Sequence, residues 1–166
     1  MTWEFGRQTP DNNLMRFVAR RFHDPAFMLD IGSGEGANAR ELLERGHKVW
    51  TLDKEAPAYI MTDIRNWYTG VSFDCIYDIN TLCHVEGPPF EKIKSWLRPG
   101  GIFFRVCPTV DTWDGVGAER FTLYAFKSNV YEDLRCFSKV DVWPAEYPDF
   151  RNPCHQIKSW IVEARP

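Results

Sequence analysis

Residues 27–53 have the sequence FMLDIGSGEGANARELLERGHKVWTLD, and this stretch decides the fold. Its apolar start, Phe27–Ile31, predicts a buried strand, and closely spaced glycines then lead into the helix-forming segment Ala37–Arg45. Gly46 is placed to end that helix, and Lys48–Asp53 predicts a second strand. A strand, a glycine turn, a helix and a strand predict a βαβ unit in which the backbone approaches a ligand at the turn.

The rest of the chain continues the alternation of strands and helices. Further helices are predicted over 11–22, from Pro89 through Leu97 and at about 122–136, and further strands at 73–79, 102–106, 139–146 and 156–164. Such alternation implies a mostly parallel sheet with helices on both faces. The last two strands have only an irregular, proline-containing connection between them, which indicates an antiparallel pair. We therefore expect an α/β fold, a doubly wound Rossmann-like sheet with a C-terminal antiparallel edge hairpin.

One segment does not fit this pattern. Only about five residues separate Asp53 from the next candidate strand, Tyr59–Thr62, whereas a parallel crossover usually needs about a dozen or more. Either a tight loop replaces the expected helix, or Tyr59–Thr62 is not a parallel strand.

Length and composition favour a single domain with its own core. The chain has 166 residues, 44% of them hydrophobic, and a formal net charge of −3. We expect residues 1–24 to form an N-terminal cap segment and helix, and residues 25–166 to form a cofactor-binding core. The longest basic cluster is Arg20-Arg21, so a nucleic-acid surface is not expected.

Cysteine usage and hydropathy predict a cytoplasmic protein. The five cysteines are odd in number, and none form a CxxC pair. Three of them lie in apolar runs, as small buried thiols do in a reducing compartment. No apolar run is long enough to cross a membrane, and the N-terminus lacks a signal-peptide pattern.

The glycine loop satisfies two patterns. One is G-x-G-x-x-G/A, typical of dinucleotide-binding strands, and the other is D-x-G-x-G-x-G, formed by Asp30, Gly32, Gly34 and Gly36. An acid at Asp30 suits a cationic ligand better than a pyrophosphate, which favours the second pattern. Asp53 lies 17 residues after Gly36. It ends the next strand, where a carboxylate can accept hydrogen bonds from ribose hydroxyls.

Four segments in order resemble the class I S-adenosylmethionine-dependent methyltransferases. Residues 27–53 resemble the first two motifs of that superfamily, and the variant GEGANA is similar to its small-molecule members, notably the tellurite-resistance and thiopurine methyltransferase group. FDCIYDINTLCHVE (73–86) resembles the fourth-strand motif, LRPGGIFFRV (97–106) the fifth-strand motif, and FKSNVYEDLRCF (126–137) the helix before strand six. The resemblance covers roughly residues 10–165.

The resemblance implies S-adenosylmethionine as cofactor, S-adenosylhomocysteine as its product, and a role for each matching residue. The methionine part would contact Gly32, Ser33, Gly34 and Gly36. Asp30 would lie near its ammonium, Asp78 would offer that ammonium a backbone carbonyl, and Asp53 would bind the ribose. Asp63 would meet the adenine amino group and Ile64 would pack on the ring. A plain helix or turn cap is the alternative for Asp63, since the short crossover departs from the family.

Few residues are candidates for assisting the chemistry. His84 follows the fourth strand and is the candidate base, although a histidine there is often a packing residue, and His155 is a second candidate in the predicted loop before the last strand. The spacing of Cys83, His84 and Cys107 does not suit a metal site, and we expect no metal. Aromatic residues on acceptor-side segments are candidates for an apolar lid: Trp3, Phe5, Trp113, Phe121, Trp143 and Tyr147.

These features predict methyl transfer to a small-molecule acceptor. The Pro-Pro-aromatic motif of amino-methylating nucleic-acid enzymes is replaced here by Asp78-Ile79-Asn80-Thr81. Two alternatives stay open: a nucleic-acid methyltransferase acting with a partner, and a catalytically inactive, cofactor-binding regulatory protein.

Overall fold

The computed structural model describes residues 9–55, 57–109, 127–149 and 152–166, without the side chains of residues 147–157. Its elements are α1 (Asn12–Arg21), β1 (Phe27–Ile31), α2 (Ala37–Glu44), β2 (Lys48–Asp53), β3 (Ile60–Met61), β4 (Phe73–Ile79), the 3-10 helix η1 (Leu82–His84), α3 (Phe90–Ser95), β5 (Leu97–Pro108), α4 (Lys127–Asp133), β6 (Lys139–Asp149) and β7 (Asn152–Arg165). The helix predicted over 122–136 is thus seen as α4, and residues 122–126 lie outside the described part.

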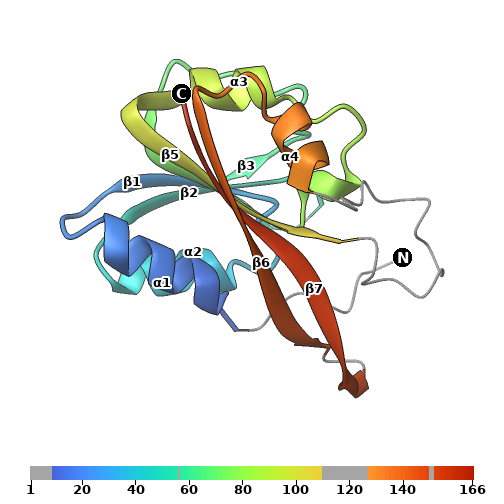
Figure 1. Ribbon diagram of the computed structural model, residues 1–166. Helices are drawn as coiled ribbons and strands as arrows, with labels where there is room; N and C mark the ends of the chain where they lie inside the picture. Colours follow the sequence, from blue (N-terminus) through green and yellow to red (C-terminus); the bar gives the residue numbers. More distant parts are fainter. Residues whose placement is uncertain (1–8, 56, 110–126, 150–151) are drawn as a thin grey trace.

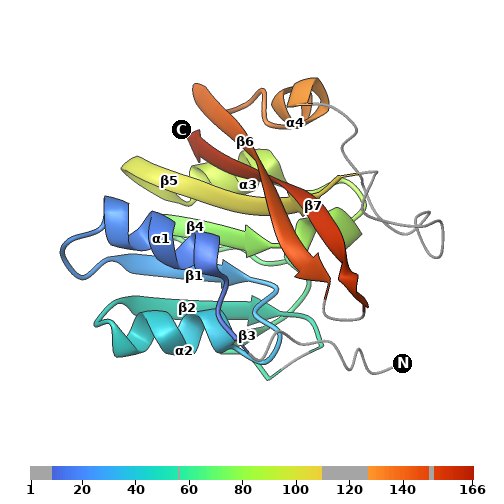
Figure 2. The same cartoon turned by 60° about the horizontal axis from the view of Figure 1, so that its bottom comes forward.

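The strands form one mixed sheet in the order β3-β2-β1-β4-β5-β7-β6. Neighbouring strands from β3 to β5 run parallel, and β7 pairs antiparallel with both β5 and β6. In Figures 1 and 2, α1 and α2 lie on one face of this sheet and α3 and α4 on the other. The predicted fold class, with its antiparallel C-terminal edge, is confirmed.

The short crossover after β2 is a tight loop. β3 contains only Ile60 and Met61, and it pairs parallel with β2 through Leu52 opposite Ile60. The backbone N–H of Tyr59 donates to Thr51 Oγ1 at 2.9 Å, which ties the incoming loop to β2. Of the two alternatives that the sequence left open, the tight loop is therefore correct.

The C-terminal hairpin is longer than predicted. β6 extends to Asp149 and β7 begins at Asn152, so the expected irregular connection is itself strand. Pro144 and Pro148 lie within β6, which is the edge strand of the sheet. Proline is tolerated there because an edge strand has backbone N–H positions without a ladder partner.

Each face of the sheet has its own hydrophobic core. The α1/α2 face buries, among others, Leu14, Phe17, Met28, Tyr77 and Phe104. The rings of Phe17 and Phe104 stack with their centroids 4.5 Å apart. The other face buries Leu29, Ile93, Phe103, Leu134 and Val162 with their neighbours. The carboxyl ends of β1, β2 and β4 meet between these layers, and the predicted site residues lie at that edge.

Candidate active site

The glycine loop turns sharply between β1 and α2. Gly32, Gly34 and Gly36 have φ angles of 69°, 52° and 78°, which side-chain-bearing residues rarely adopt. The N–H of Gly32 donates to the carbonyl of Leu52 at 2.7 Å, so the loop passes over the end of β2. Gly36 is the N-cap of α2 and provides no side-chain cap, which leaves the first N–H groups of the helix for other acceptors.

Asp53 joins the end of β2 to this loop. Its Oδ2 accepts a hydrogen bond from the N–H of Gly34 at 3.0 Å, and its Oδ1 accepts one from the N–H of Glu55 at 2.9 Å. Carboxylate oxygens at this position of a sheet are suitable acceptors for ribose hydroxyls. The structure places Asp53 beside the glycine loop, as the sequence predicted.

The segment after β4 also contacts the loop. Thr81 Oγ1 donates to the carbonyl of Gly32 at 3.3 Å. A Cβ at Gly32 would lie 2.0 Å from that same hydroxyl, so no other residue fits at position 32 without moving Thr81. The glycine loop and the segment that follows β4 are therefore packed against each other at Gly32 and Thr81.

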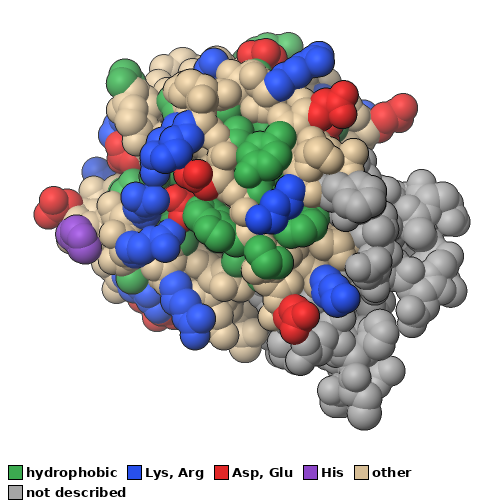
Figure 3. Space-filling model, in the orientation of Figure 1, with side chains coloured by type: hydrophobic (Ala, Val, Ile, Leu, Met, Phe, Trp, Pro, Cys, Tyr) green, Lys and Arg blue, Asp and Glu red, His purple; other side chains and the backbone are tan. Residues whose placement is uncertain are grey.

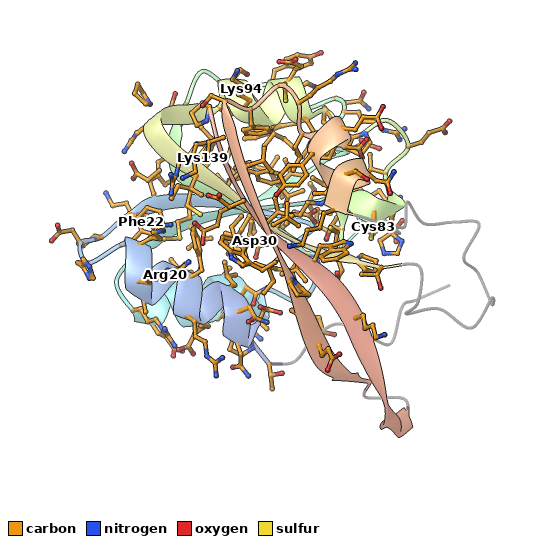
Figure 4. The ribbon with its side chains drawn as sticks, viewed as in Figure 1. Arg20, Phe22, Asp30, Cys83, Lys94 and Lys139 are labelled. Atoms are coloured by element: carbon orange, nitrogen blue, oxygen red, sulfur yellow. The ribbon has the colours of Figure 1, made fainter. Side chains whose placement is uncertain are left out.

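Asp30 lies beneath the glycine loop, opposite Tyr77 in the β1–β4 register. Its side chain is labelled in Figure 4. The carboxyl is 2% exposed, and burial raises its pKa to about 8, with the charges of Asp78 and Asp53 adding to the rise. The Tyr77 hydroxyl is near enough to lower that pKa in part, yet the pair lacks hydrogen-bond geometry, because Asp30 Oδ2 and Tyr77 Oη both have no partner among the described residues.

Four buried oxygen atoms at this edge have no hydrogen-bond partner within the part of the chain that the structure describes. They are Asp30 Oδ2, Ser33 Oγ, Tyr77 Oη and Asn80 Oδ1. Buried polar atoms are normally hydrogen-bonded, and leaving one without a partner costs about 1–3 kcal/mol. A ligand with several N–H or O–H donors would satisfy such a set, and an amino-acid group on a nucleoside has those donors. The residues present therefore fit S-adenosylmethionine.

The side chain of Asp78 has its partners inside the protein, and the predicted contact of its backbone carbonyl with the cofactor ammonium stays a prediction. Asp78 and Arg105 form an ion pair with both side chains fully buried, Arg105 Nε donating to Asp78 Oδ2 at 2.9 Å. Asp78 Oδ1 accepts from the N–H groups of Thr81 and Leu82 at 2.8 and 3.0 Å. Burial raises the pKa of Asp78, and Arg105 and the two N–H donors oppose that rise. All three contacts come from donors, so the ionised carboxylate is the form that fits, and this side chain stabilises the fold.

Asp63 forms a turn cap with Arg65. Its carboxylate accepts from the Arg65 backbone N–H at 2.8 Å and from Arg65 Nη2 at 2.7 Å. These hydrogen bonds lower the pKa of Asp63 to about 2. Ile64 is 4% exposed and belongs to the hydrophobic core. The turn-cap alternative describes Asp63 in this structure, and Ile64 has little surface left for a ring.

His84 lies in η1, and its side chain is exposed to solvent. Desolvation lowers its pKa, the charge of Asp78 and a hydrogen bond with the Asn80 backbone oppose that shift, and the charge of Lys54 adds to it. Cys83 beside it is buried and donates its thiol to the carbonyl of Asn80 at 3.3 Å. In the described ranges, no group of three or more His, Cys, Asp or Glu side chains is arranged to bind a metal ion. His155 lies in β7 and not in a loop, and its side chain is outside the described part.

Most of the predicted aromatic lid lies outside the described residues: Trp3, Phe5, Trp113, Phe121 and the side chain of Tyr147. Trp143 is described, and it lines a groove of about 310 Å³ with Phe17 of α1 and Ile161 of β7. The face in Figure 3, seen in the orientation of Figure 1, shows hydrophobic side chains among Lys and Arg. A second hollow, of about 420 Å³, is lined by Arg21, Asp74, Arg98 and their neighbours. Neither hollow contains a residue of the glycine loop.

Sequence reasoning missed four contributors to this edge: Tyr77, Asn80, Thr81 and Arg105. Arg105 had a visible signal, since it is a lone cation inside the apolar run Ile102–Val106. A buried cation requires a buried acid, and parallel pairing of β4 with β5 places Asp78 opposite it. The other three had no such signal, because their roles depend on register and turn geometry.

Among the described residues, no helix has the length and apolar character needed to cross a membrane. A search of curated protein sequences gave no match. Several solved structures share the fold. A 1,6-didemethyltoxoflavin-N1-methyltransferase from Burkholderia thailandensis, with 1,6-didemethyltoxoflavin and S-adenosylhomocysteine bound, has a TM-score of 0.73 and 22% identity over 93% of this chain and 77% of its own.

Two further structures are similar at lower identity. TehB from Haemophilus influenzae has a TM-score of 0.69 and 16% identity, over 93% of this chain and 62% of its own. Phosphoethanolamine N-methyltransferase 2 from Haemonchus contortus, in complex with S-adenosyl-L-methionine, has a TM-score of 0.66 and 16% identity, over 95% of this chain and 54% of its own. A family model described as a methyltransferase domain matches residues 2–157, nearly the whole chain, and the protein belongs to that family of S-adenosylmethionine-dependent methyltransferases.

Proposed function

We propose that this protein transfers a methyl group from S-adenosylmethionine to a small-molecule acceptor. The observation that carries the proposal is the left-handed glycine loop, bonded to Asp53, together with four buried oxygens in and around it that have no hydrogen-bond partner among the described residues. Such an edge suits a nucleoside that carries an amino-acid group. Family membership and the bound cofactors of two similar structures support the same cofactor.

Roles for the individual residues follow from their places at this edge. Gly32, Ser33, Gly34 and Gly36 present backbone and one hydroxyl to the methionine part, and Asp30 lies beneath them. Asp53, at the end of β2 and bonded to the N–H of Gly34, is the carboxylate we assign to the ribose hydroxyls. Asp63 is a weaker candidate for the adenine amino group, because Arg65 already occupies its carboxylate.

Bound S-adenosylmethionine supplies a methyl group on a sulfonium whose departure leaves a neutral thioether. The protein's main contribution is then alignment, which can be worth roughly 7–11 kcal/mol. His84 is the side chain we assign as base where the acceptor has a proton to lose. Its exposure and lowered pKa support this role, since a neutral imidazole can accept a proton.

A small acceptor is favoured over a nucleic acid. Three similar structures are named for toxoflavin-type, phosphoethanolamine and glycopeptide methylation. The chain has a net charge of −3, whereas phosphate contacts need clustered cations. We further propose a cytoplasmic location, supported by the free buried thiols Cys75, Cys83 and Cys107, and a single domain in which residues 1–24 cap the core of 25–166.

Calorimetric titration with S-adenosylhomocysteine tests the proposal. Wild-type protein should bind one molecule per chain, and Asp53→Ala should weaken binding by about 1–3 kcal/mol through lost charge-assisted hydrogen bonds. Glu41→Ala, a change on the surface of α2, is the matched control and should bind normally. Tight binding of NAD without binding of either sulfur cofactor would rule out the proposal.

Turnover of labelled S-adenosylmethionine with a panel of small amines, thiols and phenols separates the remaining alternatives. Activity that survives a chelator and changes little with salt supports a metal-independent small-molecule enzyme. Methylation of duplex DNA or structured RNA, falling steeply as salt rises, favours the nucleic-acid alternative. Cofactor binding without any turnover favours the inactive regulatory protein.

A further inference from the structure

Asn80 has an unusual backbone conformation for its residue type. Among the described residues it is the one non-glycine with a positive φ, 58°. Asparagine tolerates this left-handed region better than most residues, but the conformation still costs free energy. Strained conformations of this kind persist only where the surroundings impose them, and they cluster at functional sites.

The surroundings of Asn80 do impose its conformation. Its N–H donates to the carbonyl of Val106 at 2.9 Å, and its own carbonyl accepts the thiol of Cys83. The next two N–H groups, of Thr81 and Leu82, are bound by Asp78. Arg105 provides the counter-charge that allows the Asp78 carboxylate to be buried there. Burying an ion pair costs desolvation free energy. Because this pair holds the turn at Asn80, the conformation of that turn needs an explanation.

The side chain of Asn80 extends this set of contacts toward the glycine loop. Asp78 pairs with Ile31 in the sheet, so Asn80, two residues further on, lies level with the loop that follows β1. Thr81 contacts Gly32 directly. Asn80 Oδ1 is buried and has no hydrogen-bond partner in the described part of the chain. A strained residue level with the glycine loop thus has a buried acceptor atom that no described residue uses.

We propose that Asn80 is a cofactor-binding residue whose Oδ1 accepts a hydrogen bond from the ammonium of the methionine part, with Asp78 and Arg105 as the pair that positions it. A neutral amide oxygen binds an N–H donor without burying another charge. The nearby carboxylate of Asp78 has its contacts inside the protein, so its side chain is not available for this role. This inference rests on the proposed function, because it concerns the same cofactor.

Two ligands of defined chemistry test the inference in calorimetric titrations. S-adenosylhomocysteine has the amino-acid group, and 5′-methylthioadenosine lacks it but keeps the nucleoside. Asn80→Gly removes the amide while permitting the same φ. It should weaken S-adenosylhomocysteine binding about tenfold or more, as expected for a lost hydrogen bond to a charged group, and leave 5′-methylthioadenosine binding within about twofold.

Further measurements separate binding from stability. The melting temperature of Asn80→Gly should not fall, because glycine relieves the strain. Asn80→Asp keeps an oxygen acceptor and should retain S-adenosylhomocysteine affinity. If the glycine variant does not fold, Asn80→Ala is the second variant and should show the same loss for S-adenosylhomocysteine alone. Unchanged S-adenosylhomocysteine affinity in Asn80→Gly, or an equal loss for both ligands, overturns the inference. Failure of the wild type to bind either ligand would instead overturn the proposed function.

Discussion

Two buried aspartates at the same edge of the sheet have opposite environments. Asp30 lies near the end of β1, on the face covered by α1 and α2 and opposite Tyr77. Asp78 lies near the end of the neighbouring strand β4, on the face covered by α3 and α4, next to Arg105. Both are at most 2% exposed, and both matched motif positions that the sequence assigned to the cofactor.

The difference between them lies in their donors. Asp78 accepts three hydrogen bonds, one of them from a guanidinium, and its carboxylate is thereby compensated inside the fold. Asp30 has an oxygen without a partner in the described structure and a pKa raised to about 8 by burial. The Asp78 carboxylate, with its hydrogen bonds made inside the protein, stabilises the structure around the site. The Asp30 carboxyl has an oxygen that can still accept a hydrogen bond from a ligand.

The largest loss of stability is expected from breaking the buried ion pair between Asp78 and Arg105. Arg105→Met leaves the Asp78 carboxylate buried without its counter-charge, and such changes cost about 3–5 kcal/mol of stability. Urea denaturation of the variant and wild type measures this difference. Arg98→Met is the matched control, because the Arg98–Asp74 pair is exposed, 47% and 30%, and should contribute at most about 1 kcal/mol.

A double variant sharpens the same experiment. In Asp78→Asn/Arg105→Met both charges are gone, and the carboxamide oxygen at position 78 can still accept from Thr81 and Leu82. Most of the lost stability should return, since replacing a buried pair as a whole is often neutral. A double variant as unstable as Arg105→Met would show that the ion pair is not what makes the single change costly.

Unlike Arg105→Met, the substitution Asp30→Asn is expected to increase the stability of the protein. The pKa of Asp30 is about 8 in the folded protein and about 3.8 when unfolded, so between these values the folded state binds the extra proton. Stability is therefore lost as pH rises from about 4 to about 8, by at most about 1.4 kcal/mol per pH unit from this group. Asp30→Asn removes this dependence and should be more stable than wild type, with a gap that widens from pH 5 to pH 8.

Thermal melts across this pH range measure the gap. Tyr77→Phe is the companion variant, because it leaves the titrating group in place and removes the hydroxyl that lowers the pKa of Asp30 in part; its stability should still fall as pH rises, and the fall should continue to a higher pH than in wild type. If Asp30→Asn and wild type lose stability in parallel as pH rises, Asp30 is already compensated and the contrast with Asp78 fails.

The fold could be predicted almost entirely from the sequence, because its signals are local. The apolar run 27–31, the glycines and the helix formers of 37–44 determine the first βαβ unit without reference to the rest of the chain. The extent of β6 and β7 was missed because Pro144 and Pro148 are local strand breakers. Their tolerance depends on β6 being an edge strand, which is a property of the whole sheet.

The site was predictable only where a motif specifies a backbone path. The glycine loop and Asp53 lie together, as expected. Asp63 and Asp78 were assigned by position in a motif, and their side-chain partners, Arg65 and Arg105, come from local turn geometry and from a strand 27 residues away. For Asp63, the motif position did not tell whether the carboxylate faces a ligand or a guanidinium; for Asp78, the motif assigned only the backbone carbonyl and gave no information on the side chain.

The smallest expected effect comes from the contact that joins the two regions. Thr81 receives its backbone support from Asp78, and its hydroxyl reaches the carbonyl of Gly32 on the side of Asp30. At 3.3 Å this is a long hydrogen bond, so Thr81→Val should cost only about 0.5–1 kcal/mol of stability, while its methyl groups still fill the space beside Gly32. Thr81→Ser keeps the hydroxyl and loses a methyl group, which makes it the matched control in both denaturation and S-adenosylhomocysteine titration. Because the packing of Thr81 against Gly32 excludes any Cβ at position 32, shape and not the hydrogen bond should be what keeps the loop in place. Thr81→Val should then bind S-adenosylhomocysteine within about threefold of wild type, a difference below about 1 kcal/mol. A loss of more than about tenfold, with Thr81→Ser unaffected, would mean that the hydroxyl itself orders the glycine loop and couples the two aspartates.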